Sequence, residues 1–571
     1  MKKLSASQIS KALKLLNKIE THRYYWKASG YIDEDLEKPI IAVANSMQDA
    51  GVGHVHLKNL ATHVKEGIYS AGGTPIEFNV IGPCAGYAKT KATDDITMLY
   101  DLPQREAIAD SIEIQLMNYQ ADGLVCIGTC DKIVPGMWLG AGRLNLPTIF
   151  LLGGPAIPGE WRGNEIVFPT NVILKGLNMV LSGEMSEEEF FQESNKMESC
   201  WIKGCGACPE LTTANTTMIS TEAMGLCLPE VSTTPGNHME KVRQARKTGH
   251  IIMKLVESNL KLKKIVTKQA LENAIRCVMA VSGSTNGILH LLSFALSLNL
   301  DFSLEDVQRI SESTPYIAGI RPSGPYSMVD FHEAGGVYSL ILQLKDLFNL
   351  ECNTVLNQNI KNLLQTKQIK NPNVILPKEK AIFPSGGIVV MRGNLAPKGS
   401  LMRHTIVNAD LKEFSGPAKC FNTQLEALMG ILGGRVESGD VMVIRYQGPR
   451  GAPGFSENFK IVLLLDALGL NDVGVITDSR FSGATEGAVY VGYISPEAYV
   501  GGPLAALKDE DTITISMENK RIDVDLSEDE IQKRLETFEP PKPRIKNGVL
   551  IDWLENATQF HEGAMLKRNL E

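Results

Sequence analysis

Residues 123–132 read GLVCIGTCDK, an apolar run followed by a polar loop. The apolar part, Gly123–Ile127, predicts a strand that is buried on both faces, as strands of a parallel sheet are. Similar runs at Pro39–Asn45 and Thr148–Leu152 predict two more buried strands. The run Ile76–Ile81 alternates apolar and polar side chains, which predicts a half-buried strand.

Helical patterns lie between these strands, at residues 56–71 and 104–119. Strands that alternate with helices predict a parallel sheet covered by helices on both faces, so we expect an α/β fold. Residues from about 240 to 370 are mostly helical by periodicity and include two clear helices at 271–280 and 287–298.

The pattern changes near residues 371–380, where short strand-like runs separated by Gly and Pro begin. These runs are Gly387–Met391, Asp440–Tyr446, Val473–Thr477 and Thr512–Met517. They predict a smaller β-rich, barrel-like region with a few helices. We therefore expect an α/β N-terminal domain over residues 1–374 and a C-terminal domain over residues 375–571.

The composition excludes several classes of protein. The 571 residues carry 57 basic and 65 acidic side chains, and no basic block suggests a nucleic-acid partner. No stretch approaches the ~18 uninterrupted apolar residues of a membrane span. The first residues form an amphipathic pattern without the apolar core of a signal peptide, so we expect a cytoplasmic protein.

The loop Thr129–Lys132 follows the strand at 123–127, and ligands of α/β proteins bind at the carboxyl ends of parallel strands. Cys130 is a soft metal ligand, Asp131 is a hard one, and Lys132 could be a base or the site of a carbamate. The same loop also suits a buried Cys beside a surface ion pair. These four residues alone leave both interpretations open.

A second candidate is the Gly-rich segment Gly204–Pro209, which holds Cys205 and Cys208 and follows Cys200. Small residues around Cys suit an iron–sulfur cluster, because backbone N–H groups can then approach the sulfides. The spacing also allows zinc or a redox pair. No second Cys pair and no nearby His complete a zinc site, and a structural pair of buried thiols stays open.

A third candidate combines two Gly-rich loops, Arg445–Glu457 and Thr477–Ala484, that follow predicted strands. Glu457 is either a hard-metal ligand or a solvated surface carboxylate. Ser482 is either a nucleophile or proton carrier, or a turn residue. Phosphate-loop, dinucleotide, nucleophile-elbow and HExxH signatures are absent from the sequence.

The chain resembles the dihydroxy-acid dehydratase and phosphogluconate dehydratase family, and the three candidates match active-site segments of that family. The resemblance covers nearly the whole chain. Its matching stretches are ADGLVCIGTCDKIVPGM (121–137), LPTIFLLGGP (146–155), TTANTTMISTEAMGL (212–226), SGSTNGILHLL (282–292), PSGGIVVMRGNLAP (384–397), GDVMVIRYQGPRGAPG (439–454) and TDSRFSGAT (477–485).

The resemblance implies a homodimeric hydro-lyase that converts a 2,3-dihydroxy carboxylic acid into a 2-oxo acid. It implies an iron–sulfur cluster, [2Fe–2S] or [4Fe–4S], whose open iron binds the leaving 3-hydroxyl as a Lewis acid. It also implies a Mg²⁺ ion that holds the substrate carboxylate and 2-hydroxyl, and a serine alkoxide that removes the C2 proton.

Matched by position, the resemblance assigns a role to six residues. Cys130 and Cys208 would ligate the cluster, Asp131 and Glu457 would bind Mg²⁺, a carbamylated Lys132 would be a further Mg²⁺ ligand, and Ser482 would be the base. The C-terminal region must then fold over the N-terminal one, because residues 457 and 482 need to reach residues 130–132.

The sequence departs from the family in the cluster and metal segments. Gly53 stands where the family has its first cluster cysteine, and Cys84 is the alternative third thiolate. Ala85 stands where the family has a Mg²⁺-binding Asp, and Ala cannot bind a metal. Asp94 or Asp95 could reach back to the metal, or an extra water could bind it, or the site could be remodelled.

Two further departures are Gln447, where the family has Glu, and Ser479, where it has Gly. Both suggest an altered substrate-facing shell. The expected substrates are 2,3-dihydroxyisovalerate and its methylvalerate homologue in branched-chain amino-acid biosynthesis. The alternatives are a sugar acid such as an aldonate, an acid of a specialised pathway, or a non-catalytic relative.

Overall fold

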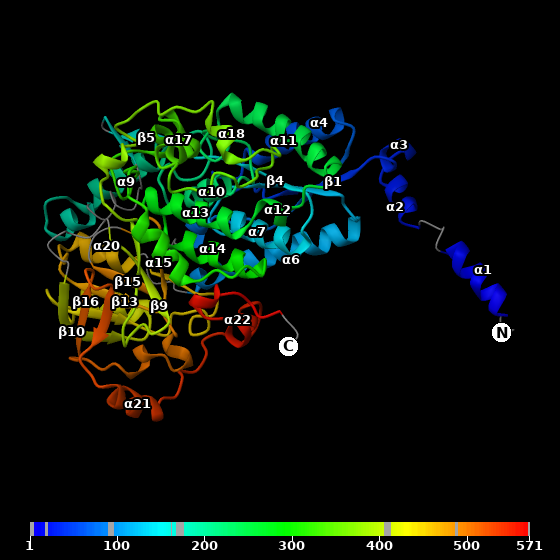
Figure 1. Cartoon of the computed structure of the whole chain (residues 1–571). Helices are drawn as coiled ribbons and strands as arrows, with labels where there is room; N and C mark the ends of the chain where they lie inside the picture. The colour runs from blue at the N-terminus through cyan, green and yellow to red at the C-terminus, as the bar shows by residue number, and fades with distance from the viewer. Residues whose placement is uncertain are drawn as a thin grey trace.

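The computed structural model describes residues 5–16, 21–88, 96–161, 163–166, 176–404, 413–458, 460–485 and 489–568. It confirms the predicted α/β class. The described residues form four sheets, and a large helical layer lies between the two largest of them (Figure 1).

The first sheet has four strands, all parallel, in the order β2-β1-β3-β4. Its strands are β1 (Ile40–Asn45), β2 (Thr74–Asn79), β3 (Gly123–Gly128) and β4 (Thr148–Leu152). β3 and β4 are buried along their whole lengths, as their apolar runs predict. β2 begins two residues earlier than the alternating run, and the predicted half-burial is confirmed: Ile76 and Phe78 are buried, whereas Glu77 and Asn79 are not.

Helices cover both faces of this sheet. α4 (Leu57–Ser70) packs against α11 (Met239–Glu257) on one face, and α6 (Pro103–Tyr119) packs against α7 (Ile133–Leu144) on the other (Figure 1). Glycines let α4 and α11 approach closely: a Cβ on Gly67 would lie 2.2 Å from the carbonyl oxygen of Arg246. The contact between these two helices therefore requires a residue without a side chain.

The predicted helical region is also confirmed. α13 (Lys268–Ala280) and α14 (Thr285–Ser297) include the two predicted helices, and both pack against α10 (Thr213–Ala223). Every residue of α10 is buried, so this helix lies inside the molecule. The N-termini of α10 and α14 consequently form part of the interior wall that faces the C-terminal region.

The second sheet has eight strands in the order β17-β16-β10-β11-β13-β15-β9-β8. These are β8 (Ile388–Met391), β9 (Gly399–Arg403), β10 (Glu413–Phe421), β11 (Val441–Ile444), β13 (Gly474–Thr477), β15 (Tyr490–Ser495), β16 (Thr512–Ser516) and β17 (Arg521–Val524). A backbone bridge between Arg392 and Arg521 joins the two ends, so the sheet is nearly closed and barrel-like. The four predicted strands are all present, whereas β9, β10, β15 and β17 were not predicted.

The four-stranded sheet is formed by residues before 375, and the eight-stranded sheet by residues after it. The division of the chain into two domains at this point stays a prediction. The largest apolar core belongs mainly to the helical region, and Phe455, Tyr493 and Trp553 add to it from the C-terminal part. The chain therefore packs its C-terminal part onto the helical layer through apolar side chains as well as through the polar site described below.

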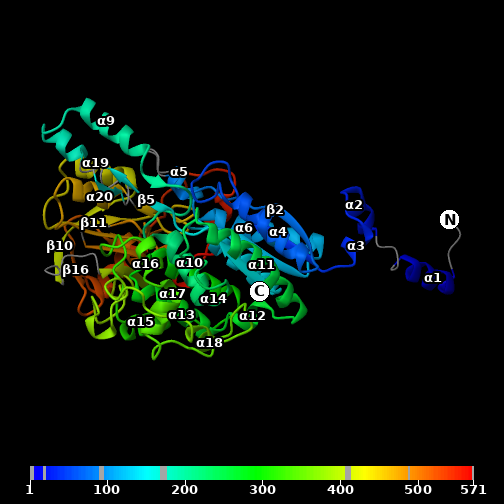
Figure 2. The same cartoon turned by 90° about the horizontal axis from the view of Figure 1, so that it is seen from above.

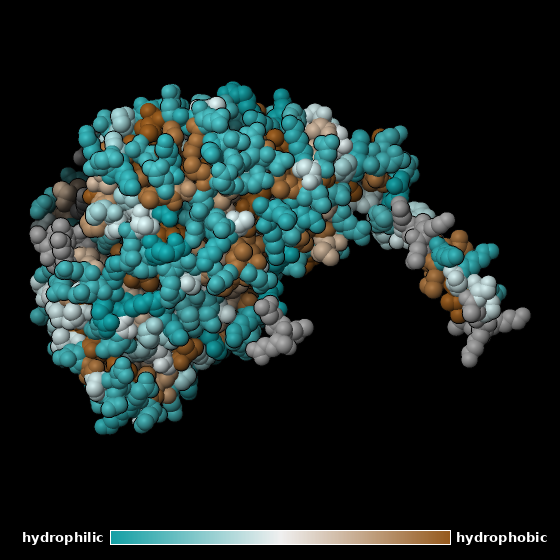
Figure 3. Space-filling view, in the orientation of Figure 1, coloured by the Kyte–Doolittle hydropathy of each residue, from teal (hydrophilic) through white to brown (hydrophobic). Residues whose placement is uncertain are grey.

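The N-terminal helix α1 (Ala6–Leu16) projects from the rest of the molecule (Figures 1 and 2). Its apolar side chains, including Ile9, Leu13 and Leu16, are exposed, and they form a brown stripe in the space-filling view (Figure 3). None of the described helices is long and apolar enough to cross a membrane.

Candidate active site

The loop Thr129–Lys132 connects the end of β3 to the start of α7, as predicted. Two of its side chains are buried, with Cys130 7% exposed and Lys132 1% exposed, whereas Asp131 is partly exposed. The interpretation of this loop as a surface ion pair is therefore wrong for Lys132, whose ammonium group is enclosed by protein.

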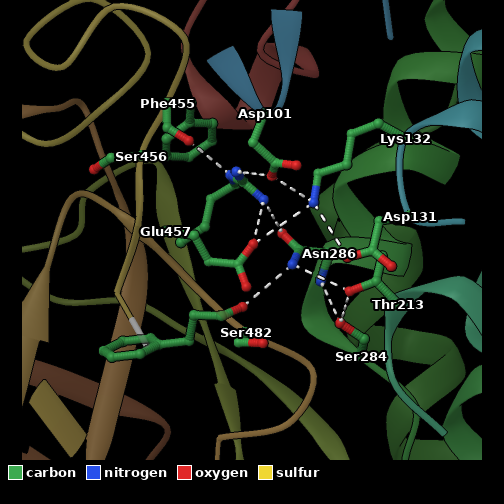
Figure 4. A network of polar contacts seen from close by, with 12 residues as sticks. Asp101, Asp131, Lys132, Thr213, Ser284, Asn286, Phe455, Ser456, Glu457 and Ser482 are labelled. Carbon is green, nitrogen blue, oxygen red and sulfur yellow. Dashed lines mark hydrogen bonds and ion pairs between the residues drawn. The ribbon is translucent and has the colours of Figure 1, made fainter. Parts of the chain in front are cut away.

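Three carboxylates surround the Lys132 ammonium (Figure 4). The Nζ atom lies 2.7 Å from Oδ2 of Asp101, 3.3 Å from Oδ2 of Asp131 and 3.6 Å from Oε2 of Glu457. Burial lowers the pKa of Lys132, but the charges of Asp101, Asp131 and Glu457 outweigh it and raise that pKa above its ordinary value. Lys132 is therefore a buried cation in this arrangement.

Arg480 is the second buried cation, carried by the short strand β14 (Arg480–Phe481). Its guanidinium lies 3.1 Å from Asp101 and 3.1 Å from Glu457, and its Nε donates to the carbonyl oxygen of Phe455. We call Asp101, Asp131, Lys132, Glu457 and Arg480 the charged cluster. It joins the end of the first sheet to the C-terminal region.

Glu457 reaches the cluster because of strand pairing within the C-terminal region. β12 (Glu457–Asn458) pairs in parallel with β14, and the register places Glu457 opposite Arg480. Glu457 is 2% exposed, so the interpretation of it as a solvated surface carboxylate is wrong. The expected folding of the C-terminal region over residues 130–132 is confirmed by its contact with Lys132.

Ser482 follows β14 directly and is 6% exposed. Arg403 stabilises the loop that carries Ser482 by donating hydrogen bonds to the carbonyl oxygens of Gly483 and Thr485, at 2.8 and 2.9 Å. A Cβ on Gly483 would lie 2.8 Å from the backbone nitrogen of Thr213, at the start of α10. The serine loop therefore lies against the wall formed by the helical region.

Asn286, near the start of α14, connects the serine loop to the charged cluster (Figure 4). Its Oδ1 accepts hydrogen bonds from Arg480 at 2.9 Å and from the Tyr493 hydroxyl at 2.7 Å. Its Nδ2 donates to the carbonyl oxygen of Phe481 at 3.3 Å. Asn286 thus orients Arg480 and the residue that precedes Ser482 at the same time.

Thiols gather beside the charged cluster. A hydrogen bond with Cys84, burial, and the charges of Cys84, Asp131 and Cys208 together raise the pKa of Cys130 well above its ordinary value. Gly53 faces the same thiol, since a Cβ there would lie 3.0 Å from the Cys130 sulfur. Cys200, by contrast, donates its thiol to the carbonyl oxygen of Lys196.

Across the described residues, no three His, Cys, Asp or Glu side chains are grouped to hold a single metal ion. At the charged cluster, the carboxylates are not grouped to hold a metal because Lys132 and Arg480 lie between them. The donor types nevertheless fit the implied groups: buried carboxylate oxygens suit Mg²⁺, and convergent thiols suit an iron–sulfur cluster.

Comparison with known proteins connects this arrangement to a family. The family model for the N-terminal region of dihydroxy-acid/6-phosphogluconate dehydratases matches residues 38–363, and the model for their C-terminal region matches residues 373–564. The chain belongs to this dehydratase family. It is therefore a hydro-lyase, and the resemblance seen in the sequence is confirmed.

Relatives named dihydroxy-acid dehydratase align with nearly the whole chain. The protein from Pyrococcus furiosus is 42% identical over 551 residues, which cover 96% of this chain and 97% of the relative. The protein from Methanococcus vannielii is 42% identical over 548 residues, covering 96% and 98%. The protein from Dehalococcoides mccartyi is 40% identical over 549 residues, covering 96% and 97%.

The remaining residues at which this dehydratase departs from its family lie in two parts of the structure, the segment after Cys84 and the loops beside Glu457. Ala85 begins the short helix α5 (Ala85–Ala88), whereas Asp94 and Asp95 lie outside the described residues. Gln447 and Ser479 bond to Ser456, the residue before Glu457: the Ser456 hydroxyl donates to Oε1 of Gln447, and the Ser479 hydroxyl donates to the carbonyl oxygen of Ser456. Both side chains thus support the strand that carries Glu457.

Sequence reasoning missed Asp101, Arg480 and Asn286 as site residues. Arg480 and Asn286 lie in stretches that resemble the family, TDSRFSGAT and SGSTNGILHLL, so a signal for them was present. Asp101 lies in none of the matching stretches, and no local pattern in MLYDLPQ points to chemistry. Only its contacts with Lys132 and Arg480 reveal it.

Gly483→Ala tests the close approach of the serine loop to α10. The added Cβ would meet the backbone nitrogen of Thr213 at 2.8 Å, so the loop must shift. We expect kcat to fall at least ~10-fold, because a small misplacement of a catalytic group slows the reaction strongly. Steady-state kinetics measures this, with Gly433→Ala at the exposed end of another helix as a control. Unchanged kcat would contradict the prediction.

Two buried carboxylates hold the loop that precedes Glu457. Asp478 accepts hydrogen bonds from the backbone N–H groups of Gln447 and Ala498, and burial raises its pKa to about 6. Glu497 accepts from the N–H groups of Arg450 and Gly451. Burial, with the charge of Asp478, raises the pKa of Glu497 to about 7.

Glu497→Gln should change how stability depends on pH. A carboxyl whose folded-state pKa is raised from 4.5 to about 7 stabilises the fold below its unfolded pKa, and this stabilisation is lost as pH rises through about 7. The melting temperature of the wild type minus that of the variant should therefore fall between about pH 5 and about pH 8. A difference that is constant or rises over this range would contradict the assignment.

Proposed function

We propose that this dehydratase converts 2,3-dihydroxyisovalerate and its methylvalerate homologue into the corresponding 2-oxo acids, as in branched-chain amino-acid biosynthesis. The names of its relatives support this substrate class. The observation that carries the proposal is the meeting of the loop Thr129–Lys132 with Glu457 in one buried site beside Ser482. We further propose that the enzyme is cytoplasmic and that it works as a homodimer, as the family resemblance implies.

The residues present fit both implied cofactors. Cys84, Cys130 and Cys208 would hold an iron–sulfur cluster, and Asp131, Glu457 and a carbamylated Lys132 would hold Mg²⁺. When bound, these groups supply Lewis-acid assistance to loss of the 3-hydroxyl and a positive charge that orients the substrate carboxylate.

Ser482 is the proposed base that takes the proton from C2 of the substrate. A hydroxyl acts as a base near neutral pH only if nearby positive charge lowers its pKa. The N-terminus of α10, which lies against the adjacent Gly483, contributes the positive end of a helix dipole. Loss of the C2 proton and the 3-hydroxyl yields an enol, which tautomerises to the 2-oxo acid.

Lys132 needs a change of charge before it can bind a metal. Its surroundings favour the ammonium form, whereas carbamylation requires the neutral amine and produces an anion. An anionic Lys132 among three carboxylates would be strongly disfavoured unless a divalent cation were present. Carbamylation of Lys132 and metal binding are therefore coupled in this proposal.

Assays of 2-oxo acid formation test the function, using anaerobically purified, cluster-loaded enzyme with Mg²⁺. We expect turnover of 2,3-dihydroxyisovalerate and a loss of at least ~10²-fold in kcat for Ser482→Ala, the size of a general-base contribution. The control is Ser438→Ala, on an exposed turn that bonds Asp472. Turnover of gluconate or 6-phosphogluconate alone would favour a sugar acid, and a wild-type rate for Ser482→Ala would remove its role.

Cys130→Ser tests the cluster ligands without measuring activity. We expect the variant to lose most of its iron, sulfide and visible absorbance, because thiolates hold such clusters. Cys420→Ser in β10 is the matched control, since that thiol lies in the C-terminal sheet, and it should keep the cluster. Full iron and sulfide content in Cys130→Ser would overturn this ligand assignment.

A further inference from the structure

Asp101 is a fully buried carboxylate at the end of the 3-10 helix η1 (Thr97–Tyr100), just before α6. Its Oδ2 atom contacts both cations of the charged cluster, Lys132 at 2.7 Å and Arg480 at 3.1 Å. Glu457 contacts the same two cations through a single oxygen, at 3.6 and 3.1 Å. Asp101 and Glu457 therefore approach the same point from the two halves of the chain.

The Lys132 ammonium occupies the point at which the carboxylates of Asp101, Asp131 and Glu457 converge (Figure 4). Carboxylate oxygens are the donors that a hard divalent cation takes, and in the structure the ammonium stands among them. Arg480 also contacts Asp101, but it shares its guanidinium and Nε among Asp101, Glu457, Asn286 and the Phe455 carbonyl.

Residue 85 lies in a segment next to η1 and offers no ligand. Ala85 starts α5, which packs against η1, the helix that Asp101 ends. Its neighbour Cys84 hydrogen-bonds to Cys130, the residue before Asp131. Residues 85 and 101 thus lie in adjoining segments beside the loop that carries Asp131, and only residue 101 carries a carboxylate.

We propose that Asp101 is a ligand of the divalent cation, together with Asp131 and Glu457, and takes the place of the carboxylate missing at Ala85. This inference rests on the proposed function for the existence of a cation site. It adds to that function a metal ligand at a position that the family resemblance did not indicate. The site retains three carboxylates, with one of them supplied by a different segment.

The test measures Mn²⁺ binding to the cluster-loaded protein by the electron paramagnetic resonance signal of free Mn²⁺. Asp101→Asn should bind Mn²⁺ at least ~10-fold more weakly than the wild type, a typical loss at a metal site. Its iron and sulfide content should not change. The control Asp110→Asn, on α6 in an ion pair with Arg143, should bind Mn²⁺ as the wild type does.

Asp101→Glu separates a ligand from a counter-ion and covers the case in which Asp101→Asn does not fold. The Glu variant keeps the negative charge but moves the carboxylate by one methylene. A counter-ion for Lys132 and Arg480 would tolerate this change, and wild-type Mn²⁺ affinity in Asp101→Glu would overturn the proposal. A clear loss of affinity supports it.

Ala85→Asp, introduced into Asp101→Asn, tests the exchange of positions. We expect the double variant to regain most of the Mn²⁺ affinity, and a double variant as weak as Asp101→Asn would contradict the exchange. Mn²⁺ binding does not depend on the substrate. The two proposals can therefore fail separately. If no dihydroxy acid reacts but Mn²⁺ binding changes as expected, the proposed function is wrong and the assignment of Asp101 as a ligand is supported.

Discussion

The buried charged cluster is the constraint on which the rest of this molecule depends. Two cations and the carboxylates of Asp101 and Glu457 lie together away from solvent, with the partly exposed Asp131 beside them, and they come from segments separated by up to 379 positions in the chain. A buried charge is tolerated only when it is paired, and removal of one partner from such a pair costs about 3–5 kcal/mol. The two halves of the chain must therefore dock in one relative position, in which every charge finds its partner.

The packing around the cluster serves this docking. Gly483 has no side chain where the serine loop meets α10, and Arg403 holds that loop through two backbone carbonyls. Asn286 bonds to Arg480 on one side and to the backbone of Phe481 on the other. Apolar contacts made by Phe455 and Tyr493 continue the same interface into the core. The site therefore lies between packed layers.

The charged cluster also explains how a dehydratase can keep its site while its sequence departs from its family. Gln447 and Ser479 both bond to Ser456 and so act on the position of Glu457 through the backbone. Gly53 leaves space at the Cys130 sulfur, and Cys84 supplies a thiol from another direction. A site built from several segments can exchange the segment that supplies a given donor, provided that the donor reaches the same point.

The sequence by itself determined the fold class, the four strands of the first sheet and the loop residues Cys130–Lys132, because these features depend on local periodicity and on residues adjacent in the chain. It also indicated Glu457 and Ser482 through a family resemblance. Strands such as β10 and β15 were missed, since their burial comes from neighbours in the nearly closed sheet. Only the tertiary structure brought Asp101 and Arg480 to Lys132, because ion pairs between distant segments leave no periodic or local signal in a single sequence.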